Sequence, residues 1–155
     1  MAGRVYTVSF LEVAASSLQD LFSFTATPNM AIRVRRLAVS QRGLTTPDFR
    51  PVRLTRFSGG FAAGVGGSVV TPVAARGSSP AATFTARAND TTPMSGGTSV
   101  VVTADDWAFQ NGYLAIFGEA DDMVARPNEA LAFTLPVSPP SALTISGHAL
   151  IEELY

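Results

Sequence analysis

Hydrophobic and polar residues alternate along most of this chain with a period of two. Residues 5–13 place Tyr6, Val8 and Phe10 on one side, with smaller side chains between them. A two-residue period is typical of a β-strand, because successive side chains point to opposite faces. The same alternation returns in eight later segments, at residues 20–27, 31–40, 52–57, 82–88, 98–103, 113–117, 130–135 and 143–151.

Turn-forming residues separate these segments. Asn111-Gly112 is a tight-turn signal, and the phase slip at Arg36-Leu37 predicts a β-bulge inside its strand. Residues 104–110 are predicted to form a short helical turn. Eight or nine short strands without a long helix predict an all-β fold: a single-domain antiparallel β-sandwich, jelly-roll-like, over residues 1–155.

Residues 58–80 break the pattern. They contain six glycines, two prolines and four serines, and few large apolar side chains. Such a segment buries too little apolar surface to order itself, and it is long for an ordinary connection. We therefore expect a long, flexible Gly-rich loop, mobile or ordered by a partner, exposed on one side of the domain.

Charge is scarce and unevenly distributed. Charged residues make up 15% of the chain, against about 25% in typical domains. All 11 cations are arginine, and there is no cysteine, which excludes disulfides and thiolate metal sites. Residues 1–76 hold nine arginines and three acids, whereas residues 77–155 hold two arginines and nine acids. This asymmetry favours a polar contact between copies, unless folding mixes the two halves.

An arginine cluster in the first half is the strongest local signal. Seven arginines fall within residues 33–56, opposed there by Asp48 alone. Three interpretations are open: a protein interface, a solvated sheet face, or nucleic-acid binding. A pI near 5.7 and the lack of interleaved aromatic residues argue against nucleic acid. The predicted interface comprises Arg33, Arg35, Arg36, Arg53, Arg56, Asp121 and Asp122.

Residues for catalysis and metal binding are few. His148 is the single histidine, and a lone histidine within a strand is more often a filler than a catalytic base. The acidic pairs Asp105-Asp106 and Asp121-Asp122 lack the ligand spacing of a calcium loop, so solvated loops or partners for arginine are the favoured interpretation. We expect no enzyme activity, no cofactor and no metal. No apolar stretch reaches the roughly 20 residues that span a bilayer, so no membrane contact is expected.

Several ordered stretches resemble a known family. These are VYTVSFLEVAASSLQDLFSFTA at the start, IRVRRLAVSQ, the Gly-rich segment, ARANDTT with SGGTSVVV, and LTISGHALIEE at the end. Together they resemble the capsid decoration, or cement, proteins of tailed bacteriophages. The resemblance implies a β-sandwich on the outer surface of the virion, made in the host cytoplasm, bound to the major capsid protein and self-associated as a homotrimer. It supplies no catalytic residue.

Other functions remain open at this point. One is another phage structural component, such as the base of a head fibre or a tail protein. A second is a carbohydrate-binding module, which needs exposed aromatic side chains; Tyr6, Trp107, Tyr113 and Tyr155 are the candidates. In the capsid interpretation, three segments extend from the rigid sandwich towards neighbouring subunits: residues 1–6, 58–80 and 118–128. Arginines of the first half meet acids of a neighbouring copy head to tail, an arrangement that closes into a ring when the rotation fits.

Overall fold

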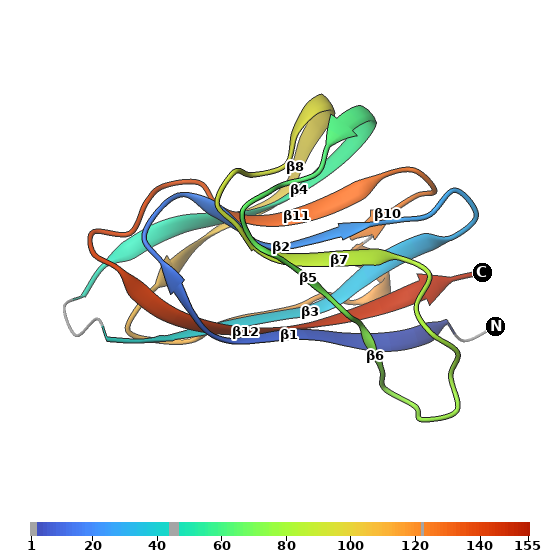
Figure 1. The fold of residues 1–155 in the computed structure, drawn as a ribbon, viewed down its shortest axis with the longest axis horizontal. Coiled ribbons are helices and arrows are strands. Elements are labelled where there is room, and N and C mark those ends of the chain that lie inside the picture. The colour runs from blue at the N-terminus through green and yellow to red at the C-terminus, as the bar shows by residue number, and fades with distance from the viewer. Residues whose placement is uncertain (1–2, 44–46, 122) are drawn as a thin grey trace.

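The computed structural model describes residues 3–43, 47–121 and 123–155, which fold into two antiparallel six-stranded sheets packed face to face (Figure 1). Sheet A consists of β1 (Arg4–Ala15), β3 (Ala31–Arg42), β6 (Val73–Ala74), β9 (Tyr113–Ile116), β10 (Val124–Ala125) and β12 (Leu143–Leu154). Sheet B consists of β2 (Gln19–Thr25), β4 (Phe49–Ala62), β5 (Ser68–Val70), β7 (Thr85–Asp90), β8 (Ser95–Ala108) and β11 (Ala130–Leu135). The all-β sandwich predicted from alternation is confirmed.

Eight of the strands form a jelly roll. In sheet A, β1, β12, β3 and β9 lie in that order, and in sheet B the order is β2, β11, β4 and β8. Because β1 to β4 alternate between the sheets, neighbours in sequence lie in opposite layers, as in a double Greek key. The strands β5, β6 and β7 form an insertion between β4 and β8, and they close the side next to β1 and β2.

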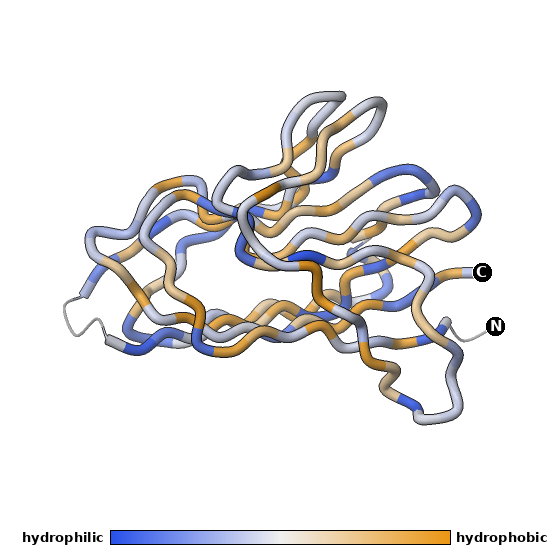
Figure 2. Tube along the Cα trace, viewed as in Figure 1, coloured by the Kyte–Doolittle hydropathy of each residue, from blue (hydrophilic) through white to orange (hydrophobic). Residues whose placement is uncertain are grey.

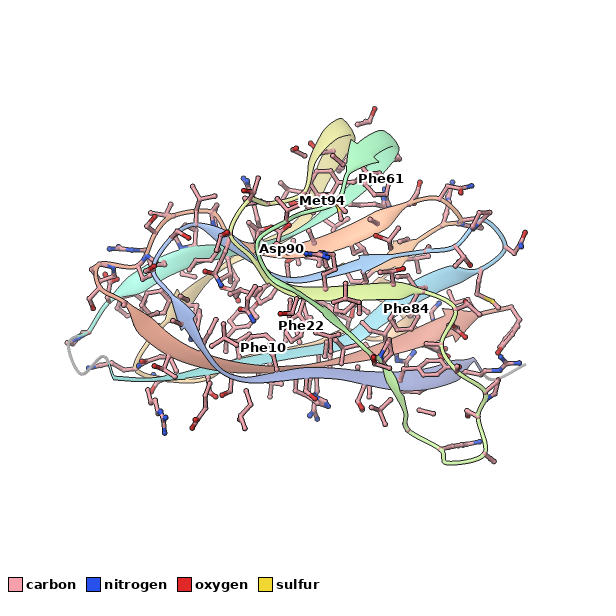
Figure 3. The ribbon with its side chains drawn as sticks, viewed as in Figure 1. Phe10, Phe22, Phe61, Phe84, Asp90 and Met94 are labelled. Atoms are coloured by element: carbon pink, nitrogen blue, oxygen red, sulfur yellow. The ribbon has the colours of Figure 1, made fainter. Side chains whose placement is uncertain are left out.

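The core lies between the two sheets and follows the predicted alternation. Along β12, residues alternate strictly between buried and half-buried positions, and the hydropathy of the strands alternates in the same way (Figure 2). Phe10, Phe22 and Phe84 lie between the layers (Figure 3). Full burial of a large apolar side chain such as Phe22 stabilises the fold by about 1.5–3 kcal/mol.

Sheet B also carries a small second core on its outer face. Phe57, Met94, Ala130 and Ala132 are buried there, with Phe61 packed beside them (Figure 3). Ala130 and Ala132 belong to β11, so this cluster explains why β11 is buried along its whole length instead of on alternate residues.

Strand pairing tests two predictions about local structure. The predicted bulge is present in β3, immediately before Arg36-Leu37: Leu150 pairs with Arg36 and Ile151 with Val34, so Arg35 is the extra residue. The helical turn at residues 104–110 is wrong, because β8 continues to Ala108 in pairing with β4. Instead, the described residues form a 3-10 turn at Glu119–Asp121.

The strand count needs a correction, from eight or nine to twelve strands in the described residues. The additional strands β5, β6 and β10 are only two or three residues long, too short to show a period. Two of them, together with the end of β4, lie within residues 58–80, so that segment is paired with β7 and β1 over part of its length.

Candidate functional site

Two arginines of the predicted interface are paired inside the chain. Nη1 of Arg33 lies 3.5 Å and Nη1 of Arg35 lies 3.2 Å from Oε2 of Glu152, and Arg35 also lies 3.6 Å from Glu119. The pairing follows from the register of β3 against β12, in which Arg33 faces Glu152. Folding therefore brings an arginine-rich strand of the first half against an acidic strand of the second.

The other predicted interface residues are dispersed. Arg36 lies on sheet A, whereas Arg53 and Arg56 lie on β4 of sheet B. The charge of Arg53 acts on the buried carboxyl of Asp20 inside the same chain. Asp121 accepts a hydrogen bond from the backbone N–H of Gly118, and Asp122 lies outside the described residues. The six described residues of this set thus lie on both sheets and do not form one patch, and the role of the set in an interface stays a prediction.

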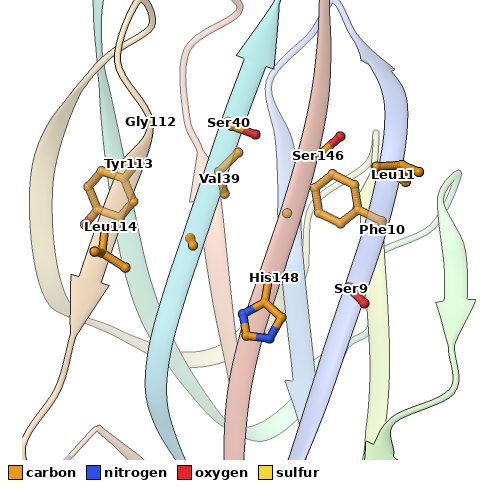
Figure 4. Close-up of a pocket in the computed structure, with 12 residues that line it drawn as sticks. Ser9, Phe10, Leu11, Val39, Ser40, Gly112, Tyr113, Leu114, Ser146 and His148 are labelled. Atoms are coloured by element: carbon orange, nitrogen blue, oxygen red, sulfur yellow. The ribbon is translucent and has the colours of Figure 1, made fainter.

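A shallow trough on the outer face of sheet A was not foreseen from the sequence. It has a volume of about 650 Å³ and crosses four strands, β1, β12, β3 and β9. Strand register aligns one row of residues across the trough: Ser9 pairs with His148, His148 with Ala38, and Ala38 with Leu114. Figure 4 looks onto this surface, with His148 on the central strand.

Small side chains and His148 form the floor of the trough, and large apolar side chains form its sides. Ser9, Ala38, Ser40 and Ser146 lie along the floor. At the sides, Leu11 is 77% exposed and Leu114 is 60% exposed (Figure 4). Leucines this exposed on a sheet face are costly to leave in water, which favours a surface that another molecule covers.

Two features of the backbone shape this surface. Beside Leu11, a bulge between Phe10 and Val13 gives Glu12 a positive φ of 54°, and the Glu12 N–H donates to Oγ of Ser146 at 3.0 Å. Gly147 has no side chain on the inner face, where a Cβ would lie 2.5 Å from Cε1 of Phe10. The ring of Phe10 fills that space and packs 5.0 Å from the ring of Phe22.

Two titratable side chains among the described residues line the trough, Tyr113 and His148. Burial raises the pKa of Tyr113 above its ordinary value of 10.0, so Tyr113 is uncharged at neutral pH. The other group is the imidazole of His148. Burial lowers its pKa below the ordinary value of 6.5, and the nearby Arg36 guanidinium lowers it further. Nη2 of Arg36 lies 3.2 Å from Nδ1 of His148. An uncharged imidazole accepts this hydrogen bond at neutral pH, so the trough presents a largely uncharged surface.

The aromatic side chains proposed for carbohydrate binding do not form an exposed platform. Trp107 and Tyr6 are buried, and Tyr113 is half-buried with its ring stacked on Phe133. Tyr155 is 59% exposed, but its ring carries the guanidinium of Arg4 at 4.7 Å. This arrangement removes the feature on which the carbohydrate-binding alternative depends.

Buried acids elsewhere have structural partners. Asp90 accepts two hydrogen bonds from Arg87, at 2.7 and 2.9 Å, and one from the N–H of Gly67. Asp20, 1% exposed, accepts from the N–H of Met94 and from the hydroxyl of Thr134. Within the described ranges, no three His, Asp or Glu side chains lie close enough together to hold a metal ion.

Comparison with known proteins adds little. No known protein family matches the chain, and no curated protein matches it. Similar solved structures include the T13 viral particle of IBDV, with 17% identity and a TM-score of 0.26 over 99% of this chain and 40% of that one. Another is the VP2 subviral particle of infectious bursal disease virus, with 14% identity and a TM-score of 0.12 over 97% and 41%. TM-scores this low support no structural argument. This chain spans about two fifths of the length of each of those chains.

The described residues contain no helix of sufficient length and apolar character to span a bilayer.

Proposed function

We propose that this chain is a structural virion protein that binds the outer surface of a capsid through the trough on sheet A and stabilises the shell. The observation that carries the proposal is the trough itself: an open, mostly apolar surface across four strands, flanked by the exposed side chains of Leu11 and Leu114. A broad, shallow surface suits a protein partner, because small-molecule sites are deeper and enclose their ligands.

The trough also has suitable chemistry for docking. Its small floor residues allow close approach of another backbone, and the hydroxyls of Ser9 and Ser40 offer hydrogen bonds at the floor. Leu11 and Leu114 provide apolar area that becomes buried on contact. Burial of each exposed leucine contributes about 1.5–3 kcal/mol.

Two further arguments support a capsid as the partner. The ordered stretches described above resemble phage decoration proteins along nearly the whole chain. A rigid two-sheet body is also suited to bridging shell subunits, because bending it would break inter-sheet packing. As a homotrimer, the state that the resemblance implies, the protein would make three equivalent contacts, and the second and third would be effectively intramolecular.

The test uses empty heads of the source phage, assembled from its major capsid protein alone. Wild-type protein is expected to co-sediment with these heads to saturation. Leu11→Asp and Leu114→Asp each place a charge in the contact and should weaken binding about tenfold or more. Leu18→Asp is the matched control, because Leu18 is also exposed, at 42%, but lies outside the trough.

Each result has a defined consequence. Wild-type protein that stays in the supernatant would refute capsid binding. Wild-type binding that Leu11→Asp and Leu114→Asp leave unchanged would refute the trough as the docking surface. A loss shared equally by Leu18→Asp would also refute it, because the effect would then not be specific to the trough.

A further inference from the structure

A cleft lies on the outer face of sheet B, on the far side of the sandwich from the trough. Leu54 points into the main core, so its neighbours along β4, Arg53 and Thr55, point to the outer face. Strand register places Thr134 of β11 beside Arg53. It also places Val101 of β8 beside Thr55. These four residues line a cleft of about 300 Å³, which is more enclosed than the trough.

The segment before β8 forms one wall of the cleft. Pro93 and Met94 line the cleft there, and Met94 is buried with Phe57 in the second core of sheet B (Figure 3). Oδ2 of Asp20 accepts the N–H of Met94 at 2.7 Å, which holds this wall against β2. The side over β8 is open, because Val101 is 49% exposed. The cleft is therefore preformed in the folded sandwich, with a fixed wall and an accessible side.

Arg53 brings a guanidinium with free donors to the cleft. Its charge acts on the buried carboxyl of Asp20, but neither a hydrogen bond nor a salt bridge joins Arg53 to another described residue. The oxygens of Asp20 accept from Met94 and Thr134 instead. A guanidinium presents its N–H groups as a planar fork that matches the two oxygens of a carboxylate. The fork of Arg53 is thus available to a ligand.

Thr55 adds a second free donor at the bottom of the cleft. The residue is 5% exposed, and its hydroxyl has no hydrogen-bond partner among the described residues. Leaving a buried hydroxyl unpaired is unfavourable, and a ligand that accepts its hydrogen bond removes that cost. Residues two apart on a strand share a face at a spacing of about 7 Å, so Arg53 and Thr55 can reach one acceptor group.

The other end of the cleft is apolar. Phe57 follows Arg53 and Thr55 on the same face of β4, so it lies at the end away from the guanidinium. Met94 and Val101 flank it. A ligand that fills the cleft therefore carries an anionic acceptor at one end and a short apolar group at the other. The volume lies at the lower limit for ligand sites, which favours a small ligand.

The charge of Asp20 restricts the anion further. Thr134 joins the two features, because it lines the cleft and donates its hydroxyl to Oδ1 of Asp20 at 2.6 Å. A carboxylate this close to the Arg53 end opposes a doubly charged anion more strongly than a singly charged one. We infer that the cleft binds a singly charged carboxylate attached to a short apolar group, with Arg53 and Thr55 donating to the carboxylate.

This site goes beyond the proposed function and does not depend on it. The cleft and the trough lie on opposite outer faces, so a protein docked through sheet A keeps the cleft accessible to the surrounding medium. Two sources of ligand share the inferred chemistry. One is a free organic acid with a short chain, and the other is the C-terminal residue of a protein chain when that residue is apolar.

An NMR titration of the isotope-labelled protein with sodium butyrate, at constant ionic strength, tests the site. The amide signals of Thr55, Met94 and Val101 should shift and saturate with a Kd of about 1 mM, a reasonable affinity for so few ligand atoms. Butyramide has the same shape without the charge and should leave these signals in place. Sodium acetate lacks the apolar chain and should bind more weakly, as should inorganic phosphate.

Four variants identify the groups that bind butyrate. Arg53→Gln should weaken binding about tenfold or more, because charge-assisted hydrogen bonds are lost. Arg56→Gln is the matched control: Arg56 lies on the same strand, points to the opposite face and does not line the cleft. Thr55→Val keeps the shape without the hydroxyl and should weaken binding about twofold to tenfold. Asp20→Asn removes the opposing charge and should tighten binding, which a general loosening of the fold would not do.

Each outcome supports or overturns the inference. Shifts that never saturate, an equal response to butyramide, or equal weakening by Arg56→Gln would overturn the site. Phosphate that binds as tightly as butyrate would overturn the assignment of a singly charged carboxylate. A short peptide ending in leucine, compared with its C-terminally amidated form, separates the two sources: tighter binding of the free-acid peptide than of butyrate supports a chain terminus, and the reverse supports a free acid. Capsid heads take no part in this titration, so its failure is distinct from a failure of the proposed function.

Discussion

Asp20 offers the sharpest test of how the sandwich is held together. Its side chain is 1% exposed, and it accepts the N–H of Met94 at 2.7 Å and the hydroxyl of Thr134 at 2.6 Å. These bonds tie the segment before β8 to β2 and β11. Burial raises the pKa of Asp20 above its ordinary value of 3.8, and the nearby carboxylate of Asp90 adds to this shift.

Two substitutions at Asp20 should have opposite consequences. Asp20→Ala removes both acceptors and leaves two buried donors unsatisfied, at a cost of about 1–3 kcal/mol for each. Asp20→Asn keeps the shape: its carbonyl oxygen accepts from Met94, and its NH₂ donates to the Thr134 oxygen, because a hydroxyl can rotate to accept. The asparagine also avoids burying a charge, so this variant should match or exceed wild-type stability at pH 7.

The pH dependence follows from the direction of the shift. A carboxyl whose pKa is raised by folding binds its proton more tightly in the folded state. Its contribution to stability is therefore fully present below pH 3.8 and is lost as the pH rises through the folded pKa of Asp20. Asp20→Asn mimics the protonated form, so its advantage over wild type should disappear as the pH falls towards 3.8.

Urea unfolding at pH 7 and at several acidic pH values measures both effects. The midpoint for Asp20→Ala should fall well below wild type at pH 7, and the midpoint for Asp20→Asn should not. The reasoning would be refuted if Asp20→Asn destabilised the protein as much as Asp20→Ala, or if its difference from wild type were independent of pH.

Three further outcomes are expected from the same assays. Gly147→Ala forces a Cβ against the ring of Phe10, so unfolding free energy should fall by about 1–3 kcal/mol, and an unchanged value would contradict the packing. Trp107 is the single tryptophan and is 1% exposed, so its fluorescence should be blue-shifted in the native state and move to the red on unfolding. Folding lowers the pKa of His148, so the stability contributed by its neutral imidazole is fully present above pH 6.5 and is lost as the pH falls through the folded pKa. His148→Gln should remove that pH dependence of the unfolding free energy.

The fold was largely predictable because its main signal is local. Alternation within β1, β3 and β12 identifies each strand without knowledge of its partners. A phase slip in β3 likewise located the bulge. The extension of β8 through Trp107 was missed because this part of the strand is defined by pairing with β4, a contact between residues far apart in the sequence.

The surface features were much less predictable because they depend on long-range register. Arg33 and Glu152 are 119 residues apart in the sequence. The sequence therefore shows that the two halves differ in charge, but it does not show that these two residues pair within one chain. The floor of the trough likewise combines Ser9, Ala38 and His148 from three strands. Within residues 58–80, the glycine content predicted flexibility, whereas Gly64 lies so close to Asp90 that a side chain on it would collide there.

Electron cryomicroscopy of empty heads incubated with the purified protein tests the central claim most directly. The account predicts added density on the outside of the shell, into which the sandwich fits with sheet A and its trough towards the capsid. Heads without added density, or a sandwich oriented with sheet A away from the shell, would contradict it.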